Sequence, residues 1–133
     1  MRALMRRRPL LREAVVDANF VIAVMFKDHA FHNEAIREWG ALDAGYLPFV
    51  AACEIAYFLL KNKMSLSPLQ EVLTDPKLHL LNDEQSDLLY AVENAEKVKS
   101  YDDFNDMVII GAAKRMGMEV ISFDRKMREK VGK

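Results

Sequence analysis

Short apolar runs alternate with longer amphipathic stretches along the whole chain. The short runs are bounded by polar or turn-forming residues, and they predict buried strands at 14–16, 46–48, 77–81 and 119–122. The stretches between them predict helices at 19–24, 30–42, 49–61, 65–74, 83–98 and 103–116, with a last helix after 124. Strands that alternate with helices in this way predict an α/β domain with a parallel sheet and right-handed crossovers.

Capping and turn residues mark where several of these elements begin and end. Asp17 follows the first strand and is a candidate N-cap for the next helix. Ser67 with Pro68 predicts a helix start, and Gly117 predicts a helix end. The stretch 49–61 is strongly apolar, and Glu54 is its one internal charge, so we expect a buried helix there.

Composition fits one globular domain. The chain has 133 residues, of which 51% are hydrophobic and 29% charged, which argues against disorder. No apolar run approaches the roughly 20 residues that a membrane-spanning helix needs, so no membrane is expected. Residues 1–12 carry five arginines without the apolar core of a signal peptide. We therefore divide the chain into a basic arm, 1–12, and a single domain, 13–133.

The single cysteine, Cys53, cannot form an internal disulfide. A reducing cytoplasm is therefore the expected location. Because no histidine or asparagine pattern accompanies Cys53, we expect it to be a small buried apolar side chain. The net charge of −1 gives no nucleic-acid signal by itself. The segment 83–106 is nevertheless mainly acidic and the segment 114–133 mainly basic, as a protein that binds a polyanion beside buried acids requires.

Four carboxylates stand in apolar surroundings where a charge is costly to bury: Asp17, Glu54, Asp106 and Asp124. Asp17 and Asp124 follow predicted strands, and Asp106 lies near a helix start. Ligands of parallel sheets bind at the carboxyl ends of the strands. Several oxygen ligands converging there suit Mg²⁺ or Mn²⁺, as one or two ions.

Each acid also has an ordinary structural interpretation. Asp17 and Asp124 would serve as helix caps. Asp106 would complement the helix dipole. Glu54 would pair with a buried basic group. The argument for a site rests on the four acids together.

The order and spacing of these acids resemble the PIN-domain family, including the VapC-type toxins, over roughly 14–127. Val15-Val16-Asp17-Ala18-Asn19 resembles the family's first motif, and Ala52-Cys53-Glu54-Ile55 its second. Phe104-Asn105-Asp106 resembles the third motif, and the segment from Val120 to Lys126 the fourth. The resemblance implies a three-layer α/β/α domain around a parallel sheet of about four to five strands.

The resemblance further implies a metal-dependent endoribonuclease in which the four acids hold Mg²⁺ or Mn²⁺ and hydrolyse RNA. The groups expected to orient carboxylates or water around the metal are Asn19, Ser122 and Asp103. Asp102 or Asp103 is also a candidate ligand. The residues expected to contact RNA phosphates are Arg125, Lys126 and Arg128. A toxin of this kind is expected to have a cognate antitoxin protein as its partner.

Two other functions fit parts of the pattern. A module of the same fold would bind or help process RNA with little or no turnover. A haloacid-dehalogenase-like phosphatase is less suitable, because it would have a second aspartate where this chain has Asn19. A purely structural protein explains neither Glu54 nor Asp106 in apolar surroundings.

A two-fold homodimer is also expected. Many PIN domains pair, and the stretch from Tyr57 to Leu66 together with Trp39 supplies more bulky apolar groups than one face of two short helices buries.

Overall fold

A computed structural model describes residues 11–132 of the chain. Its four strands form one parallel sheet in the order β3-β2-β1-β4. They are β1 (Glu13–Val16), β2 (Ala44–Pro48), β3 (Leu78–Leu81) and β4 (Glu119–Ile121). The predicted parallel sheet is therefore confirmed, and all four strands fall where the apolar runs placed them.

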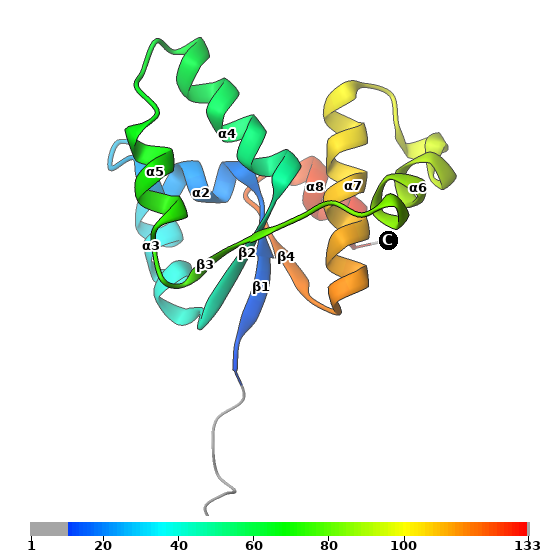
Figure 1. Cartoon of the computed structure of the whole chain (residues 1–133), viewed down its shortest axis with the longest axis horizontal. Coiled ribbons are helices and arrows are strands. Elements are labelled where there is room, and N and C mark those ends of the chain that lie inside the picture. Colours follow the sequence, from blue (N-terminus) through cyan, green and yellow to red (C-terminus); the bar gives the residue numbers. More distant parts are fainter. Residues whose placement is uncertain (1–10, 133) are drawn as a thin grey trace, which may run out of the picture.

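Helices cover both faces of the sheet (Figure 1). The described helices are α2 (Ala18–Met25), α3 (His32–Ala41), α4 (Phe49–Lys61), α5 (Ser67–Leu73), α6 (Gln85–Glu93), α7 (Tyr101–Met116) and α8 (Arg125–Val131), with a 3₁₀ turn η1 (Ala95–Lys97). Figure 1 shows the sheet from its β3 edge, with α2, α3 and α5 on one side and α6 and α7 on the other. The expected three-layer α/β/α architecture is confirmed.

Two neighbouring strands, the central β1 and the edge strand β4, bring their carboxyl ends together. Val16 pairs with Ile121, and the backbone N–H of Asp17 donates to the Ile121 carbonyl at 3.0 Å. Ala14, Val15 and Val16 are fully buried. Since β1 lies inside the sheet with neighbours on both edges, its position is fixed by packing. The residues that follow β1 and β4 are thereby held side by side.

Three local predictions were wrong. The helix predicted at 83–98 ends at Glu93, because Asn94 leaves the helical conformation and η1 follows. Ser67 does not cap α5, whose N-cap position is Leu66 without a side-chain bond. Helix α4 is only half-buried: Ala51, Ile55 and Leu59 face the core, while Cys53 is exposed. An apolar sequence alone does not show how much of a helix its neighbours cover.

The basic arm falls almost entirely outside the described residues, because the structure describes the chain from Leu11 onward. Arg12, the last residue assigned to that arm, is bound to the fold. Its guanidinium contacts Glu38 at 3.0 Å and Glu119 at 3.5 Å. Arg12 thus connects α3 with the start of β4, and it acts as part of the domain.

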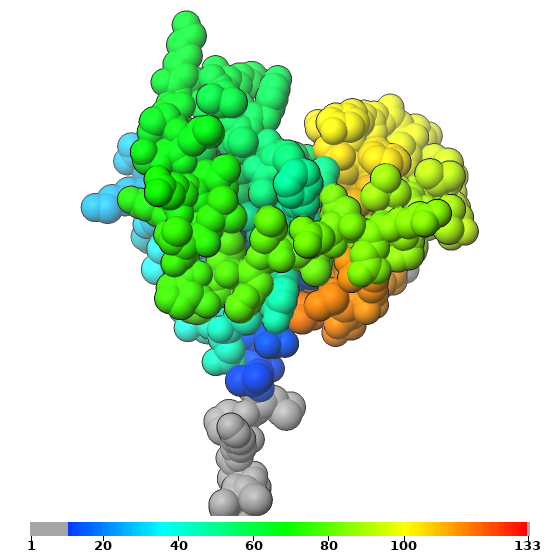
Figure 2. Space-filling view, viewed as in Figure 1, coloured from blue at the N-terminus to red at the C-terminus, as the bar shows by residue number. Residues whose placement is uncertain are grey.

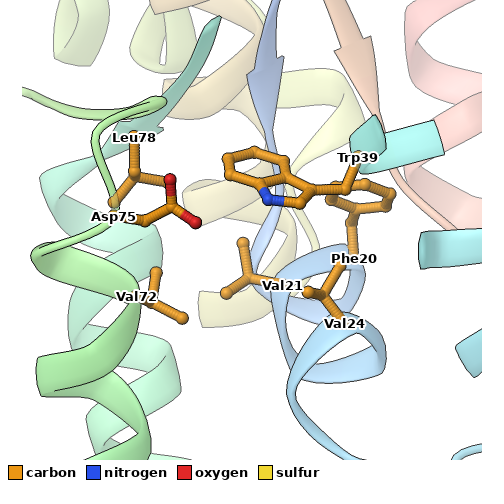
Figure 3. A pocket seen from close by; sticks show the side chains of 7 residues that line it. All are labelled: Phe20, Val21, Val24, Trp39, Val72, Asp75 and Leu78. Atoms are coloured by element: carbon orange, nitrogen blue, oxygen red, sulfur yellow. The ribbon is translucent and has the colours of Figure 1, made fainter. Parts of the chain in front are cut away.

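An apolar cavity lies between α2, Trp39 of α3 and the segment that joins α5 to β3 (Figure 3). Trp39 also closes over β2, where a Cβ atom on Gly45 would approach its ring to 2.6 Å. Gly45 is therefore required for the tryptophan to lie flat on the sheet. Within residues 11–132, no helix is both long and apolar enough to cross a membrane.

Candidate active site

Asp17 lies directly after β1 and is 4% exposed. One carboxylate oxygen, Oδ1, accepts from the Ala18 backbone N–H at 2.8 Å, which makes Asp17 the N-cap of α2. The other, Oδ2, accepts from the Ser122 hydroxyl at 2.9 Å. No basic side chain among the described residues pairs with Asp17. The capping role and a functional role are compatible here, because the second oxygen faces the β4 end.

Ser122 and Asn19 connect the ends of β1 and β4. Besides bonding Asp17, the Ser122 hydroxyl lies 3.2 Å from Asn19 Oδ1 and accepts from the Asp124 backbone N–H at 3.0 Å. Asn19 Oδ1 also accepts from the Phe123 backbone N–H at 3.1 Å. Asp124 caps α8 through the Lys126 backbone N–H. This network fixes the positions of Asp17 and Asp124 relative to each other.

Glu54 projects from α4 toward the same place. Its Oε2 atom accepts from the Asn105 side-chain amide of α7 at 3.2 Å. The alternative that Glu54 pairs with a buried basic group is not supported within residues 11–132, because its bonded partner there is this neutral amide. Glu54 therefore has no neighbouring cation within residues 11–132 to offset its negative charge when it ionises.

Asp106 lies in the second turn of α7 and is 8% exposed. Its Oδ2 atom accepts from the Lys130 ammonium at 3.0 Å, and Lys130 also contacts Asp103 Oδ1 at 3.0 Å. Asp103 is held in addition by the Lys99 backbone N–H at 2.9 Å. Asp106 is thus the one member of the four acids with a cationic partner in the described part of the chain.

The four acids line one open hollow at the carboxyl ends of β1 and β4. Its lining consists of Asp17, Ala18, Asn19, Ile22, Glu54, Asp102, Asp106 and Asp124. The hollow continues into a wider cleft between α4 and the start of α7, through the shared residues Glu54 and Asp102. Figure 2 shows the molecule hollowed between these two helices. The two acids farthest apart in the sequence, Asp17 and Asp124, are separated by 107 positions and are thereby brought to one place.

The acids of the hollow oppose one another's ionisation. Burial raises the pKa of Glu54 from an ordinary value of 4.5 to about 7, the negative charges of Asp17, Asp106 and Asp102 add to this rise, and the Asn105 amide opposes it. Burial raises the pKa of Asp106 to about 6, against the effect of Lys130. Burial also raises the pKa of Asp17. A hollow of this kind favours a cation over an empty state.

The donor set fits a hard divalent cation in chemistry, since it consists of carboxylate oxygens backed by an amide and a hydroxyl. Among residues 11–132, however, no three acidic, histidine or cysteine side chains converge closely enough to hold one ion directly. Mg²⁺ keeps several waters and commonly uses one or two carboxylates. The arrangement therefore suits an ion held partly through water, or side chains that close in when it binds.

Comparison with protein families decides the assignment. The model of the PIN domain matches residues 14–133, which is nearly the whole chain. The chain belongs to the PIN-domain family. No curated protein matches the sequence.

Solved structures of similar fold agree with this family. VapC20 of Mycobacterium tuberculosis, a toxin described as cleaving the sarcin–ricin loop, is 15% identical, with a TM-score of 0.75 over 88% of this chain and 94% of that chain. VapBC2 of Rickettsia felis, bound to a DNA fragment of its promoter, has a TM-score of 0.64 at 13% identity over 88% and 92%. A toxin–antitoxin complex of Klebsiella pneumoniae has a TM-score of 0.63 at 16% identity over 84% and 86%. At such identities the likeness establishes the PIN fold.

The basic residues expected to contact RNA occupy different surroundings in this PIN domain. Arg125 and Lys126 are exposed on α8. Arg128 donates from Nε to the Ser122 carbonyl at 2.7 Å and lies over the Phe123 ring. It lines a separate hollow beside Arg12. Arg128 therefore supports the turn between β4 and α8 and does not line the acidic hollow.

Two bonded partners of the acids in the PIN-domain hollow, Asn105 and Lys130, carried no signal in the sequence. Asn105, which bonds Glu54, is 2% exposed, and its neighbour Asp106 drew attention instead. Lys130, which bonds Asp106, lies in a basic segment that is typical of a solvated helix. Both act through contacts with residues at least 24 positions away. Asp102, an open alternative in the sequence, lines the hollow, whereas Asp103 bonds Lys130.

Proposed function

We propose that this PIN domain is a metal-dependent endoribonuclease that hydrolyses RNA phosphodiester bonds. The observation that carries the proposal is the hollow lined by Asp17, Glu54, Asp106 and Asp124. The four acids are supplied by four separate regions of the fold and have mostly neutral hydrogen-bonding partners. Helix capping accounts for Asp17 and Asp124 singly, but it does not account for Glu54 and Asp106 facing the same hollow.

The residues that would hold Mg²⁺ or Mn²⁺ are Asp17, Glu54, Asp106 and Asp124. A bound divalent cation would supply a water of lowered pKa and offset the negative charge that develops on the phosphate. Ser122 and Asn19 would keep the Asp17 and Asp124 carboxylates in place through their bonds across the strand ends. Asn105 would orient Glu54 in the same way. Asp103 would act indirectly, by binding Lys130, which in turn contacts Asp106.

RNA would lie in the cleft between α4 and α7 that opens from the hollow. Tyr57 and Tyr101 line this cleft and are 67% and 75% exposed, and Lys61 lies beside Tyr57. Exposed aromatic rings next to a lysine suit the stacking of bases and the binding of phosphate. On α8, Arg125 and Lys126 would contact phosphates that extend beyond the acids, with Arg128 behind them.

The biological role we propose is that of the toxin of a toxin–antitoxin pair. The solved structures of similar fold include toxin–antitoxin complexes, which supports a protein partner that restrains the nuclease. A chain with a free cytoplasmic ribonuclease activity requires such restraint. The alternative, an RNA-binding or RNA-processing module with little turnover, is favoured by one observation: the acids do not converge to direct ligand distance in the described residues.

A homodimer is the second partner proposal. Leu60, Met64, Leu66 and Leu73 of the α4–α5 region are at least 40% exposed, which leaves an apolar surface on two adjacent helices. Leu59 belongs to the core instead, so this surface is smaller than the sequence indicated. Sedimentation equilibrium tests the proposal, since a mass of 15.3 kDa at all micromolar concentrations would contradict it.

Cleavage of a labelled, unstructured RNA in Mg²⁺ or Mn²⁺ tests the proposed activity. We expect cleavage by the wild-type chain and its loss in EDTA. Asp106→Asn keeps the shape of the side chain and should lower the rate by about 100-fold or more. Glu93→Gln, an equal charge change on the exposed surface of α6, should leave the rate unchanged. Binding of RNA without cleavage in either metal would favour the alternative module.

A further inference from the structure

Lys130 of α8 is the one cation that the described chain directs at the four acids of the hollow. Its ammonium lies 3.0 Å from Asp106 Oδ2 and 3.0 Å from Asp103 Oδ1, and its side chain is 12% exposed. The two carboxylates come from one face of α7, where positions 103 and 106 are neighbours. Lys130 therefore bridges α8 to α7 through a largely enclosed pair of ion pairs.

The position of this ammonium matters because of what Asp106 faces. Asp106 lines the acidic hollow together with Asp17 and Asp124. One oxygen of Asp106, Oδ2, is committed to Lys130, and Asp103 is anchored by the Lys99 backbone as well. Of the two carboxylates that Lys130 contacts, only Asp106 thus belongs to the proposed cation site. Lys130 adds one positive charge at the edge of that site.

We propose that Lys130 is an internal counter-ion that competes with the divalent cation for Asp106 and so sets the metal concentration at which the site loads. The inference rests on the proposed function of the hollow. Without a divalent cation, Lys130 partly neutralises the acids and holds α8 against α7. When a divalent cation binds, the Lys130–Asp106 contact weakens, and Lys130 stays attached through Asp103. Lys130 is thus a positioning residue that acts through Asp106.

A purely structural role makes a different prediction. If Lys130 only fastened α8 and kept Asp106 in a productive orientation, its removal would loosen the site and weaken cation binding. If it competes, its removal makes the hollow more negative and frees Asp106 Oδ2, so that a cation binds more tightly. The sign of the change in cation affinity therefore separates the two roles.

Calorimetric titration of the full-length chain with Mn²⁺, without RNA, measures that sign. We expect Lys130→Gln to bind Mn²⁺ about tenfold more tightly than the wild type. Lys130→Arg keeps the charge and should not show this gain in affinity. Lys114→Gln is the matched control, because it removes the same charge from an exposed position of α7, the helix that carries Asp106. It should change the affinity by less than about twofold.

Thermal unfolding provides a second measurement on the same proteins. In EDTA, Lys130→Gln should melt at a lower temperature than the wild type, because two carboxylates lose their partner. Its gain in melting temperature on adding Mn²⁺ should exceed that of the wild type. Equal or weaker Mn²⁺ binding by Lys130→Gln would overturn the inference while leaving the metal site intact. No Mn²⁺ binding by either protein would overturn the metal site and the inference together.

A measurement on the wild-type chain tests the inference even if Lys130→Gln folds poorly. In the wild-type chain, the Lys130 ammonium should give an NMR signal protected from exchange, since it is held in two ion pairs. Adding Mg²⁺ should shift this signal, whereas the backbone amide signal of Lys114 should stay unchanged. A Lys130 signal that does not respond to saturating Mg²⁺ would contradict competition at Asp106.

Discussion

Two buried aspartates of this PIN domain have opposite surroundings. Asp87 of α6 is 1% exposed and forms an ion pair with Arg115 of α7. Arg115 donates from Nε to Asp87 Oδ1 at 3.0 Å and from Nη2 to Asp87 Oδ2 at 2.9 Å. Asp87 also completes a capping box with Glu84. Asp17 is almost equally buried, yet its partners are a hydroxyl and a backbone N–H, and its charged neighbours are other acids.

The difference separates an acid that stabilises the fold from one that is available for binding. The Arg115–Asp87 pair fastens α6 to α7, the two helices that cover one face of the sheet. The acidic hollow has no comparable pairing apart from Lys130, and the pKa values of its carboxyls are raised. Burial alone does not distinguish the two aspartates, whereas the presence or absence of a basic partner among residues 11–132 does.

Removing Arg115, the basic partner of Asp87, should have the largest effect on stability. Arg115→Ala leaves Asp87 buried without its partner and should lower the free energy of unfolding by about 3–5 kcal/mol. Mn²⁺ affinity should stay within about twofold of the wild type, because the pair lies away from the hollow. Chemical denaturation and calorimetry measure the two quantities. Lys114→Ala, its exposed neighbour, should cost less than about 0.5 kcal/mol. Equal losses for both variants would contradict the comparison.

Neutralising Asp17, which has no basic partner among residues 11–132, should raise stability instead. Asp17→Asn keeps the shape, removes a charge from a crowded site and should raise the melting temperature measured in EDTA. RNA cleavage should nevertheless fall by about 100-fold or more, since a proposed metal ligand is lost. Melting curves and single-turnover cleavage check both parts. Undiminished cleavage in saturating Mg²⁺ would count against Asp17 as a ligand.

The raised pKa values in the hollow should make the stability of the metal-free chain depend on pH. The pKa of Glu54 in the folded chain, about 7, lies above its ordinary 4.5. The folded state therefore retains a proton that the unfolded state has lost, and metal-free stability should decline as pH rises from about 4.5 to about 7. Glu54→Gln should flatten part of this decline, with the remainder due to Asp106. Glu93→Gln should leave the curve unchanged.

The affinity for a divalent cation should rise over the same pH range in which metal-free stability declines. Protons and a divalent cation compete for the Glu54 carboxylate, so Mn²⁺ should bind more weakly as pH falls below about 7. Titrations at several pH values measure this trend. A pH-independent affinity would show that Glu54 is not part of the cation site.

The smallest expected effect concerns the cleft next to the hollow. Tyr57→Ala should weaken binding of an unstructured RNA by about fivefold, through loss of one stacking ring. Tyr57→Phe should retain the affinity of the wild type. Leu89→Ala removes a half-exposed apolar side chain from α6 and should have no effect. Fluorescence anisotropy with the Asp17→Asn protein avoids cleavage during the measurement. A similar loss for Leu89→Ala would place RNA on the α6 face instead.

Local sequence patterns sufficed for most of the fold. The apolar run before Asp17 specifies β1, and Gly117 adopts the left-handed conformation, with φ of 67°, that ends α7. Helix α4 was predicted with its observed bounds, Phe49–Lys61. The sequence did not predict that one side of α4 is exposed to solvent. That exposure depends on how α4 and α7 are placed relative to the sheet, which the composition of α4 alone does not determine.

The site was predictable only in its acids. Asp17, Glu54, Asp106 and Asp124 stand out because a charge in an apolar run requires an explanation. Their hydrogen-bonding partners do not stand out in this way. Asn105 and Lys130 are ordinary residues of polar helix segments, and their contacts with Glu54 and Asp106 exist only after the chain has folded.

Anomalous X-ray scattering from crystals grown with Mn²⁺ tests the central claim most directly. The claim is that Asp17, Glu54, Asp106 and Asp124 form one divalent-cation site. We expect one or two anomalous peaks in the hollow at the ends of β1 and β4, with carboxylate oxygens or bound waters as ligands. Millimolar Mn²⁺ with no peak there, or with peaks only at acids outside the hollow, would contradict the claim.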